Sequence, residues 1–165
     1  MKRNMLLSIA TAVLAITPAA FGNDSTLGIT VGPEATFTTV ASTTALTKSD
    51  LTFAAYSGTT PFSYKIRTSQ SNGTGSITVQ VTTFGTGGPA VADLAYTCTA
   101  PSSGTPCSSS TAASTTTATS VVGFGADAHS ADTADSGSAV WTLQDRTGIK
   151  TGDYSSTATF TISAT

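Results

Sequence analysis

The stretch from Pro61 to Phe84 constrains the fold more than any other part of the chain. Large apolar side chains alternate with polar ones on both sides of an Asn72-Gly73 pair: Phe62, Tyr64 and Ile66 before it, and Ile77, Val79 and Val81 after it. Alternation with a period of two is typical of a β-strand that buries one face. An Asn-Gly pair between two such strands predicts a hairpin, because a type I′ turn needs positive φ at both central residues.

The register of this expected hairpin follows from its turn. With Asn72-Gly73 as the loop, Ile66 lies opposite Val79. Two residues further from the turn, Tyr64 lies opposite Val81. The apolar side chains of both strands then share one face, whereas a slip of one residue would separate them. The chain is therefore expected to contain an antiparallel sheet with one buried side.

The first 22 residues have the pattern of a secretory signal peptide. A basic start at Lys2-Arg3 precedes the apolar run Met5–Ile16, and small residues at Ala20 and Gly22 precede a cut before Asn23. The run is shorter than the roughly 20 residues that a membrane span needs. A membrane anchor is the alternative interpretation. We expect an exported protein, located in the periplasm, at the cell surface or outside the cell.

The rest of the chain, residues 23–165, has the composition of one all-β domain. Thr, Val, Phe and Tyr favour strands, while the helix formers Leu, Glu, Lys, Arg and Met are scarce. Charged residues make up only 10% of the chain and the net charge is −2, so a nucleic-acid partner has no electrostatic support. Lys65 and Arg67 fall on the solvent face of the expected hairpin. No later apolar run is long enough to predict a membrane span in the mature chain.

Several other alternating stretches are separated by turn residues. We expect further strands at Leu27–Val31, Phe37–Val40, Leu51–Ala55, Leu94–Cys98, Val140–Leu143 and Tyr154–Ile162, with a short apolar island at Val121–Phe124 and long loops at Ser102–Ala118 and Gly125–Gly137. About eight or nine short strands with turns between them predict a single antiparallel β-sandwich, immunoglobulin-like or jelly-roll-like. A small β-barrel is the alternative, because pattern alone does not distinguish two packed sheets from a closed one.

Cys98 and Cys107 are the only two cysteines. In an exported protein such a pair is expected to form a disulfide. Pro101, Gly104 and Pro106 lie between them and can turn the chain back on itself. A metal site or a catalytic thiol would need further ligands or a base, and the chain has a single histidine.

That histidine, His129, lies in an acidic loop with Asp127, Asp132 and Asp135. Carboxylates and an imidazole can hold a cation, but their spacing matches no calcium loop. A solvated acidic loop is the simpler interpretation. We expect no metal and no cofactor, and whether residues 125–137 bind a cation stays open.

A catalytic triad is not indicated by the sequence. No serine lies in a Gly-x-Ser-x-Gly elbow, and the only histidine is in a polar loop where it is poorly placed to be buried and oriented. We therefore expect no catalytic residues and no enzymatic activity.

Two aromatic residues near the C-terminus have structural interpretations. Trp141 shares its expected strand face with Leu143, which favours a place in the core over stacking on a sugar. Tyr154 follows Gly152-Asp153 and is well placed to pin a corner of a sandwich.

The C-terminal residues also carry a family resemblance. Gly152-Asp153-Tyr154 followed by the alternating Thr157–Ile162 resembles the Gly-x-Tyr and final strand of secreted bacterial fimbrial-subunit and spore-coat-U-like proteins. Trp141-Thr142-Leu143 is similar to the Trp-x-Leu element of cell-wall-binding surface domains. The resemblance covers the segment from Trp141 to Ile162. It implies a structural role at the cell surface, with assembly through strand exchange.

These observations favour an exported structural or adhesive surface protein that acts without catalysis, such as a fimbrial or filament subunit. Sheet edges with few lysines can accept a strand from another molecule, so self-association or a surface partner is expected. A monomeric secreted domain that binds carbohydrate is the alternative, and burial of Trp141, Tyr64 and Tyr96 would count against it. A secreted enzyme is a third hypothesis, which an open hollow containing His129 would favour.

The segment after the predicted cut has two interpretations. Leu27, Ile29 and Val31 alternate with polar residues or glycine, and Gly32-Pro33 interrupts the pattern. The simpler interpretation is an ordinary first strand paired within its own domain. The sharper hypothesis is a strand donor that leaves its own domain and completes the sheet of a neighbour.

Overall fold

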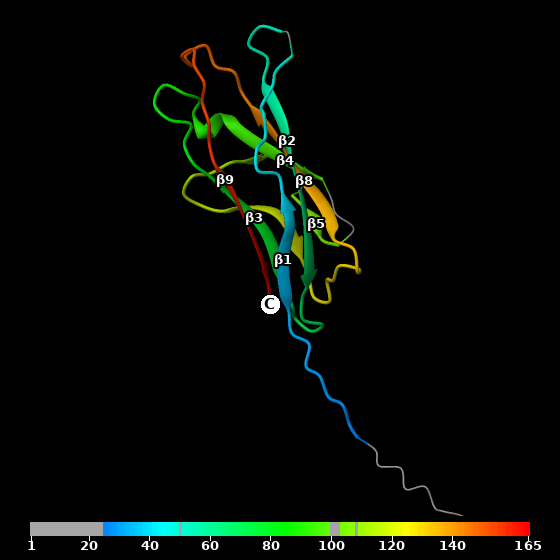
Figure 1. The fold of residues 1–165 in the computed structure, drawn as a ribbon. Coiled ribbons are helices and arrows are strands. Elements are labelled where there is room, and N and C mark those ends of the chain that lie inside the picture. The colour runs from blue at the N-terminus through cyan, green and yellow to red at the C-terminus, as the bar shows by residue number, and fades with distance from the viewer. Residues whose placement is uncertain (1–24, 50, 100–102, 108) are drawn as a thin grey trace, which may run out of the picture. The chain divides into compact units, whose positions relative to one another are not determined.

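The computed structural model describes residues 25–49, 51–99, 103–107 and 109–165 (Figure 1). One compact unit runs from Val31 to Thr165, and the chain up to Thr30 forms a separate unit. The expected signal peptide, residues 1–22, lies outside the described residues. Within those ranges, the structure contains no helix with the length and apolar character needed to cross a membrane.

The described residues form two antiparallel sheets. The strands are β1 (Glu34–Val40), β2 (Tyr56–Arg67), β3 (Gly75–Val81), β4 (Leu94–Thr99), β5 (Thr105–Pro106), β6 (Thr111–Ala112), β7 (Thr119–Phe124), β8 (Asp135–Leu143) and β9 (Ala158–Ala164), with one 3-10 turn, η1 (Val91–Asp93). The first sheet has the order β1-β2-β8-β4-β6 and the second β5-β7-β3-β9. The two sheets pack face to face, which confirms the predicted β-sandwich.

The core lies between the sheets and is rich in aromatic side chains. Phe62, Tyr64 and Tyr96 are almost fully buried, and Trp141 packs at 5.1 Å from the ring of Tyr96. The indole Nε1 of Trp141 donates a hydrogen bond of 2.8 Å to the hydroxyl of Thr60. The polar atom of this large side chain is thus satisfied inside the core, as burial requires. The prediction that Trp141 belongs to the core is confirmed.

The predicted hairpin at Asn72-Gly73 is wrong. Strand β2 pairs with β1 and β8, whereas β3 pairs with β7 and β9 in the other sheet. Ile66 lies opposite Ala35 instead of Val79. Asn72 has a φ of 61°, but Gly73 is not among the glycines with positive φ, so the connection is not a type I′ turn.

The physical reason is that alternation does not identify a strand's partner. Two strands that face each other across a sandwich core bury alternate residues in the same way as two strands paired in one sheet. Tyr64, Ile66, Val79 and Val81 are all buried, as the pattern predicts, but their strands lie in opposite layers. Lys65, on the outer face of β2, is exposed as expected.

Two other expected strands are also absent from the described structure. Leu27–Val31 lies outside the strands, and β1 begins only at Glu34, after the Gly-Pro pair. Leu51–Ala55 forms a turn in which the Ala54 amide donates to the Leu51 carbonyl, and Phe53 takes a φ of 55°. The side chains of Leu51 and Phe53 are exposed, so their alternation does not reflect a buried face.

The predicted disulfide between Cys98 and Cys107 is confirmed, with their Cα atoms 5.4 Å apart. It ties β4 of one sheet to the residue that follows β5 of the other. The Ser/Thr-rich stretch around it is more ordered than the long exposed loop expected. It contributes the short strands β5 and β6 and one buried side chain, Ala113.

The expected acidic loop at 125–137 is partly built into the first sheet. The Thr68 amide donates to the Ala128 carbonyl and the Ser130 amide donates to the Ile66 carbonyl, each at 2.9 Å. This pairing continues β2 beyond its partner β8 and sets His129 opposite Arg67. Asp135 already belongs to β8 and is buried.

Candidate functional site

The four edge strands of the sandwich differ in length and chemistry. Strands β5 and β6 have two residues each, and Pro106 of β5 has no amide hydrogen to donate. Strands β1 and β9 have seven residues each and carry a single charged residue between them, Glu34. Natural edges are usually blunted by short length, proline or charge. Neither β1 nor β9 is short or contains a proline, and Glu34 at the start of β1 is the single charge on them.

The two long edges lie close together on one side of the sandwich (Figure 1). Phe62 of the core packs between them, with its ring 6.2 Å from that of Phe37 in β1 and 5.8 Å from that of Phe160 in β9. Both of these rings are only half-buried, and so is Ile162 in β9. This side of the molecule therefore presents apolar side chains beside unpaired backbone.

The N-terminal segment presents the complementary pattern. The exposed fractions of Leu27, Ile29 and Val31 are 94%, 88% and 57%. These residues occupy alternate positions, so in an extended conformation all three face the same side. Residues 27–31 have no strand conformation in the described structure, so the expected first strand is absent there.

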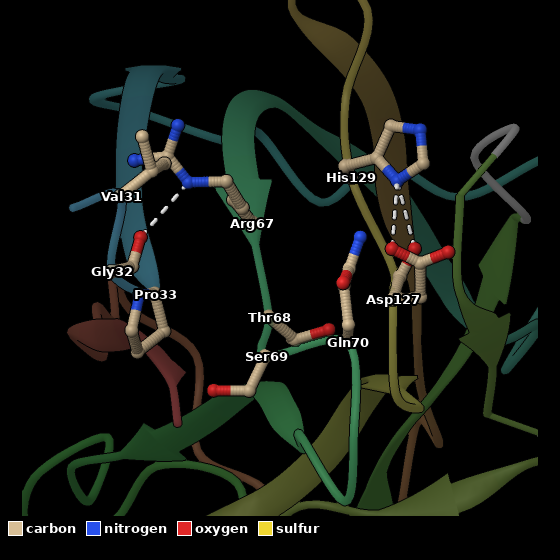
Figure 2. Close-up of a pocket in the computed structure, with 9 residues that line it drawn as sticks. All are labelled: Val31, Gly32, Pro33, Arg67, Thr68, Ser69, Gln70, Asp127 and His129. Carbon is tan, nitrogen blue, oxygen red and sulfur yellow. Dashed lines mark hydrogen bonds and ion pairs between the residues drawn. The ribbon is translucent and has the colours of Figure 1, made fainter. Parts of the chain in front are cut away.

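Arg67 contacts residues 32–34, which lead into β1. Its Nε donates a 2.9 Å hydrogen bond to the Gly32 carbonyl (Figure 2), and its guanidinium forms a 2.9 Å ion pair with Glu34. Pro33, between these two partners, fixes its own φ. The chain therefore enters β1 along a defined path.

Arg67 and His129 are also shared by two hollows on the surface. The first, of about 470 Å³, lies between residues 31–33 and the loop that carries Asp127 (Figure 2). The second, of about 650 Å³, runs over the outer faces of β1 and β2 and is also lined by residues 129–131. Both volumes fall within the range of small-ligand sites.

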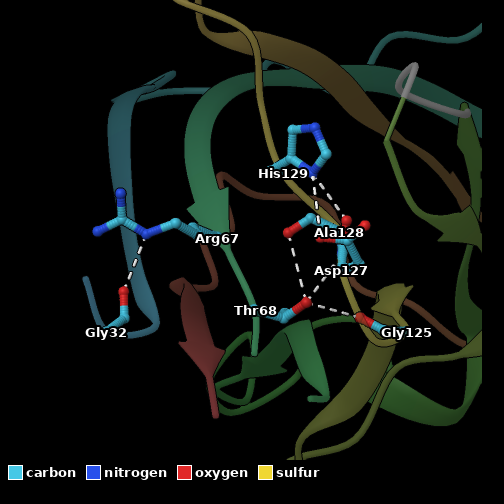
Figure 3. A network of polar contacts seen from close by, with 7 residues as sticks. All are labelled: Gly32, Arg67, Thr68, Gly125, Asp127, Ala128 and His129. Carbon is cyan, nitrogen blue, oxygen red and sulfur yellow. Dashed lines mark hydrogen bonds and ion pairs between the residues drawn. The ribbon is translucent and has the colours of Figure 1, made fainter. Parts of the chain in front are cut away.

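A small buried residue positions this region. The Thr68 hydroxyl donates to the Gly125 carbonyl at 2.8 Å and accepts from the Ala128 amide at 2.9 Å (Figure 3). The next residue, His129, has its Nδ1 at 2.8 Å from the Asp127 carbonyl. A carbonyl only accepts, so this contact requires a proton on Nδ1 and leaves Nε2 toward solvent.

The open hollow beside His129 is the feature that would favour an enzyme. A catalytic role would require His129 to be paired with a nucleophile such as a serine. Among the described residues, His129 contacts Asp127 alone through hydrogen bonds or charge. The nearby Ser130 hydroxyl donates to the Asp135 carboxylate at 2.8 Å and accepts from the Ile66 amide. Among the residues that the structure describes, no serine is hydrogen-bonded to His129.

The aspartates expected around His129 do not converge. Asp135 faces inward and accepts hydrogen bonds from Ser103 and Ser130, while Asp127 is exposed beside the imidazole. No group of three His, Cys, Asp or Glu side chains that could hold a metal occurs in the described ranges.

The tyrosines and tryptophan considered for sugar stacking are buried. Trp141, Tyr64 and Tyr96 are each at most 4% exposed. Burial raises the pKa of Tyr64 to about 12, although its hydrogen bond to the Ser103 carbonyl acts in the opposite direction. Burial also raises the pKa of Tyr96. These three residues offer no aromatic platform, which counts against the carbohydrate hypothesis in its original form.

Tyr154 lies where a corner residue was expected. Its hydroxyl reaches the carbonyls of Gly87 and Lys150, at 3.0 and 3.1 Å, and so ties two loops together.

No family model, curated protein or solved structure matches the chain. The long edges, the N-terminal segment and the hollows beside Arg67 are the candidate sites that the structure offers.

Sequence reasoning located some of these features and missed others. It singled out Leu27, Ile29, Val31 and His129, but gave Arg67 and Thr68 no functional role. Their importance depends on contacts with residues sixty positions further along the chain. A basic residue at the end of a strand was the only available signal.

Proposed function

We propose that this protein is an exported structural or adhesive subunit that assembles through β-strand pairing and performs no catalysis. The observation that carries the proposal is the exposure of Leu27, Ile29 and Val31. Large apolar side chains left in water at alternate positions of one segment favour a binding role for it. Long, nearly uncharged edges on the same protein supply a matching acceptor.

In the proposed assembly, the segment of one molecule pairs with the free edge of β9 in the next. Backbone hydrogen bonds extend the second sheet by one strand. The three apolar side chains cover the half-buried Phe37, Phe160 and Ile162 on that side. Full burial of a Leu or Ile side chain contributes roughly 1.5–3 kcal/mol, which offsets part of the cost of ordering and association.

Two further observations support export and a structural role. The disulfide is of the kind that persists in oxidising compartments outside the cytoplasm. The Gly152-Asp153-Tyr154 motif and the strand after it resemble fimbrial-subunit and spore-coat-U-like proteins, which implies strand exchange at a cell surface. Tyr154 ties two loops, which fits a structural role for that motif.

Deletion of residues 23–31 tests the proposal. The truncated protein should remain folded with a nearly unchanged melting temperature, because Leu27 and Ile29 are exposed and lie outside the compact unit. It should stay monomeric by light scattering, while the full mature chain forms oligomers that negative-stain microscopy shows as linear chains. A synthetic peptide of residues 23–31 should bind the truncated protein.

Matched substitutions refine the test. Replacing Leu27, Ile29 and Val31 by serine should abolish assembly, whereas Thr26→Ser and Thr30→Ser on the opposite face should preserve it. Mature protein that stays monomeric at high concentration contradicts the proposal. So does a deletion that unfolds the monomer, because the segment would then belong to its own domain.

A further inference from the structure

Basic side chains gather on the outer face of the first sheet, at the end of β2. Lys65 and Arg67 occupy alternate positions on this face, and His129 lies directly opposite Arg67 in the antiparallel bridge. Directly opposed residues point to the same side of a sheet. Half of the six basic side chains within the described ranges are therefore neighbours: Lys65, Arg67 and His129, as against Lys48, Arg146 and Lys150 elsewhere. We call these three neighbours the basic cluster.

The basic cluster has unused binding capacity. Lys65 takes part in none of the ion pairs or side-chain hydrogen bonds found among the described residues. Arg67 pairs with Glu34, but their side chains are 44% and 79% exposed. Exposed ion pairs of this kind are weak, so a competing carboxylate can displace Glu34 at little cost. The bond from Arg67 to the Gly32 carbonyl meanwhile keeps the guanidinium in place.

The two hollows suit a ligand made of successive units. They share Arg67 and His129, and Lys65 lines the second. The first offers neutral hydrogen-bonding groups, the Ser69 hydroxyl and the Gln70 amide, next to the Asp127 carboxylate (Figure 2). Such groups bind the hydroxyls of a sugar, which both donate and accept.

We propose that the basic cluster and its two hollows bind an acidic oligosaccharide, a linear chain of sugars that carry carboxylates. Arg67 binds one carboxylate through its planar donor edge, and Lys65 binds the carboxylate of an adjacent unit. Ser69, Gln70 and Asp127 bind sugar hydroxyls in the first hollow. This site does not depend on strand pairing, and it uses charge and hydrogen bonds where the earlier carbohydrate hypothesis required exposed aromatic rings.

A nucleic acid fits the same surface less well. The residues that line the two hollows include no Phe, Tyr or Trp on which a base could stack. Glu34 and Asp127 lie within the site and repel a backbone that carries one charge on every phosphate. A uronic acid chain places hydroxyls as well as carboxylates along its length, and these can contact the acidic side chains as donors.

Calorimetric titration of the mature protein with tetragalacturonate tests the proposal, with maltotetraose as the neutral comparison. We expect the acidic chain to bind at least roughly tenfold more tightly, and added salt to weaken its binding. Lys65→Gln should weaken it roughly tenfold, as for loss of one charge-assisted contact. Lys150→Gln, which removes a lysine from the loop pinned by Tyr154, should leave the affinity unchanged.

A second variant, Glu34→Gln, tests the contribution of Arg67 separately from that of Lys65. Glu34→Gln should tighten binding, because it frees Arg67 from its partner. Thermal melting of each variant confirms that it is folded. The proposal is overturned if tetragalacturonate does not bind at millimolar concentration, or if maltotetraose binds equally well. It is also overturned if Lys65→Gln and Lys150→Gln behave alike, or if single-stranded DNA binds more tightly than tetragalacturonate.

Discussion

At the scale of single residues, Thr68 has an effect out of proportion to its size. It is only 4% exposed, and its hydroxyl bonds both the Gly125 carbonyl and the Ala128 amide. These backbone groups belong to the loop that carries His129. A buried hydroxyl with two backbone partners therefore decides where an exposed imidazole lies.

Thr68→Val should destabilise the protein by about 1–3 kcal/mol, because it removes the hydrogen bonds to the Gly125 carbonyl and the Ala128 amide. Thr68→Ser is the matched control, since it keeps the hydroxyl and loses only a methyl group. Urea unfolding measures the stability, and the NMR signals of the His129 ring report its surroundings. We expect these signals to move in the valine variant and to stay near their wild-type positions in the serine variant. Equal stability of the two variants would contradict this role of the hydroxyl.

Tyr64 should make the stability of the fold depend on alkaline pH. An unfolded tyrosine has a pKa of about 10. Burial raises the pKa of Tyr64 to about 12 in the folded protein. Between these values the unfolded chain loses a proton that the folded protein keeps, so the free energy of unfolding decreases as pH rises. This contribution is complete below pH 10.

The slope of that decrease is the measurement. Tyr64→Phe removes the titrating group, and urea unfolding between pH 9 and pH 12 should show a shallower loss of stability than in the wild type. The variant also loses the hydrogen bond to the Ser103 carbonyl, so its stability should be lower at neutral pH. Parallel curves for the two proteins would show that Tyr64 does not titrate in this way.

At the scale of elements, the connection between β2 and β3 shows how a turn sequence can serve a different geometry. Gly73 is buried, and a Cβ atom there would lie 2.3 Å from the Ser69 carbonyl oxygen. The glycine is thus needed for a close approach of backbone to backbone, and not for a positive φ. The left-handed conformation belongs to Asn72, a residue type that tolerates it.

Gly73→Ala should therefore destabilise the domain by roughly 1–3 kcal/mol, the range for overpacking at a site that must shift to make room. Gly123→Ala in β7 is the matched control, because a Cβ atom there meets nothing within 4 Å. Thermal melting of the two variants compares them directly. A melting temperature for Gly73→Ala as high as that of the control would show that the connection relaxes freely.

Much of the fold could be predicted from the sequence, and the limits have a physical cause. Alternation identified the inward residues of β2 and β3, since side chains in any strand alternate between its two faces. It could not say whether those strands pair or face each other. The exposed Leu51 and Phe53 imitate a strand because a turn can carry the same spacing. Tertiary contacts alone distinguish these cases.

The candidate site was less predictable than the fold for the same reason. His129 and the alternating Leu27, Ile29 and Val31 stand out in the sequence. The neighbourhood of Arg67 and His129 depends on pairing between distant segments, and the exposure of an edge depends on which strands it does not meet. Local patterns carry little information on either.

At the scale of the whole compact unit, the two sides of the sandwich are chemically unequal. The side with β5 and β6 is closed by short strands, Pro106 and the disulfide. The side with β1 and β9 has long edges and half-buried rings. Hydrogen exchange should be faster at the edge amides of β1 and β9, which contact solvent, than in the ladder of β2 and β8, which is enclosed between neighbours.

This inequality limits the dimensionality of any growth through the sheets. A molecule with free strand edges on two opposite sides can add neighbours on both sides without limit, as in fibrillar aggregates. When one side offers no free strand edge, each molecule can pair with others only through its remaining side. In the proposed assembly, the side closed by the disulfide and Pro106 accepts no further strand, so growth gives a thread or a closed pair and not an unbounded sheet.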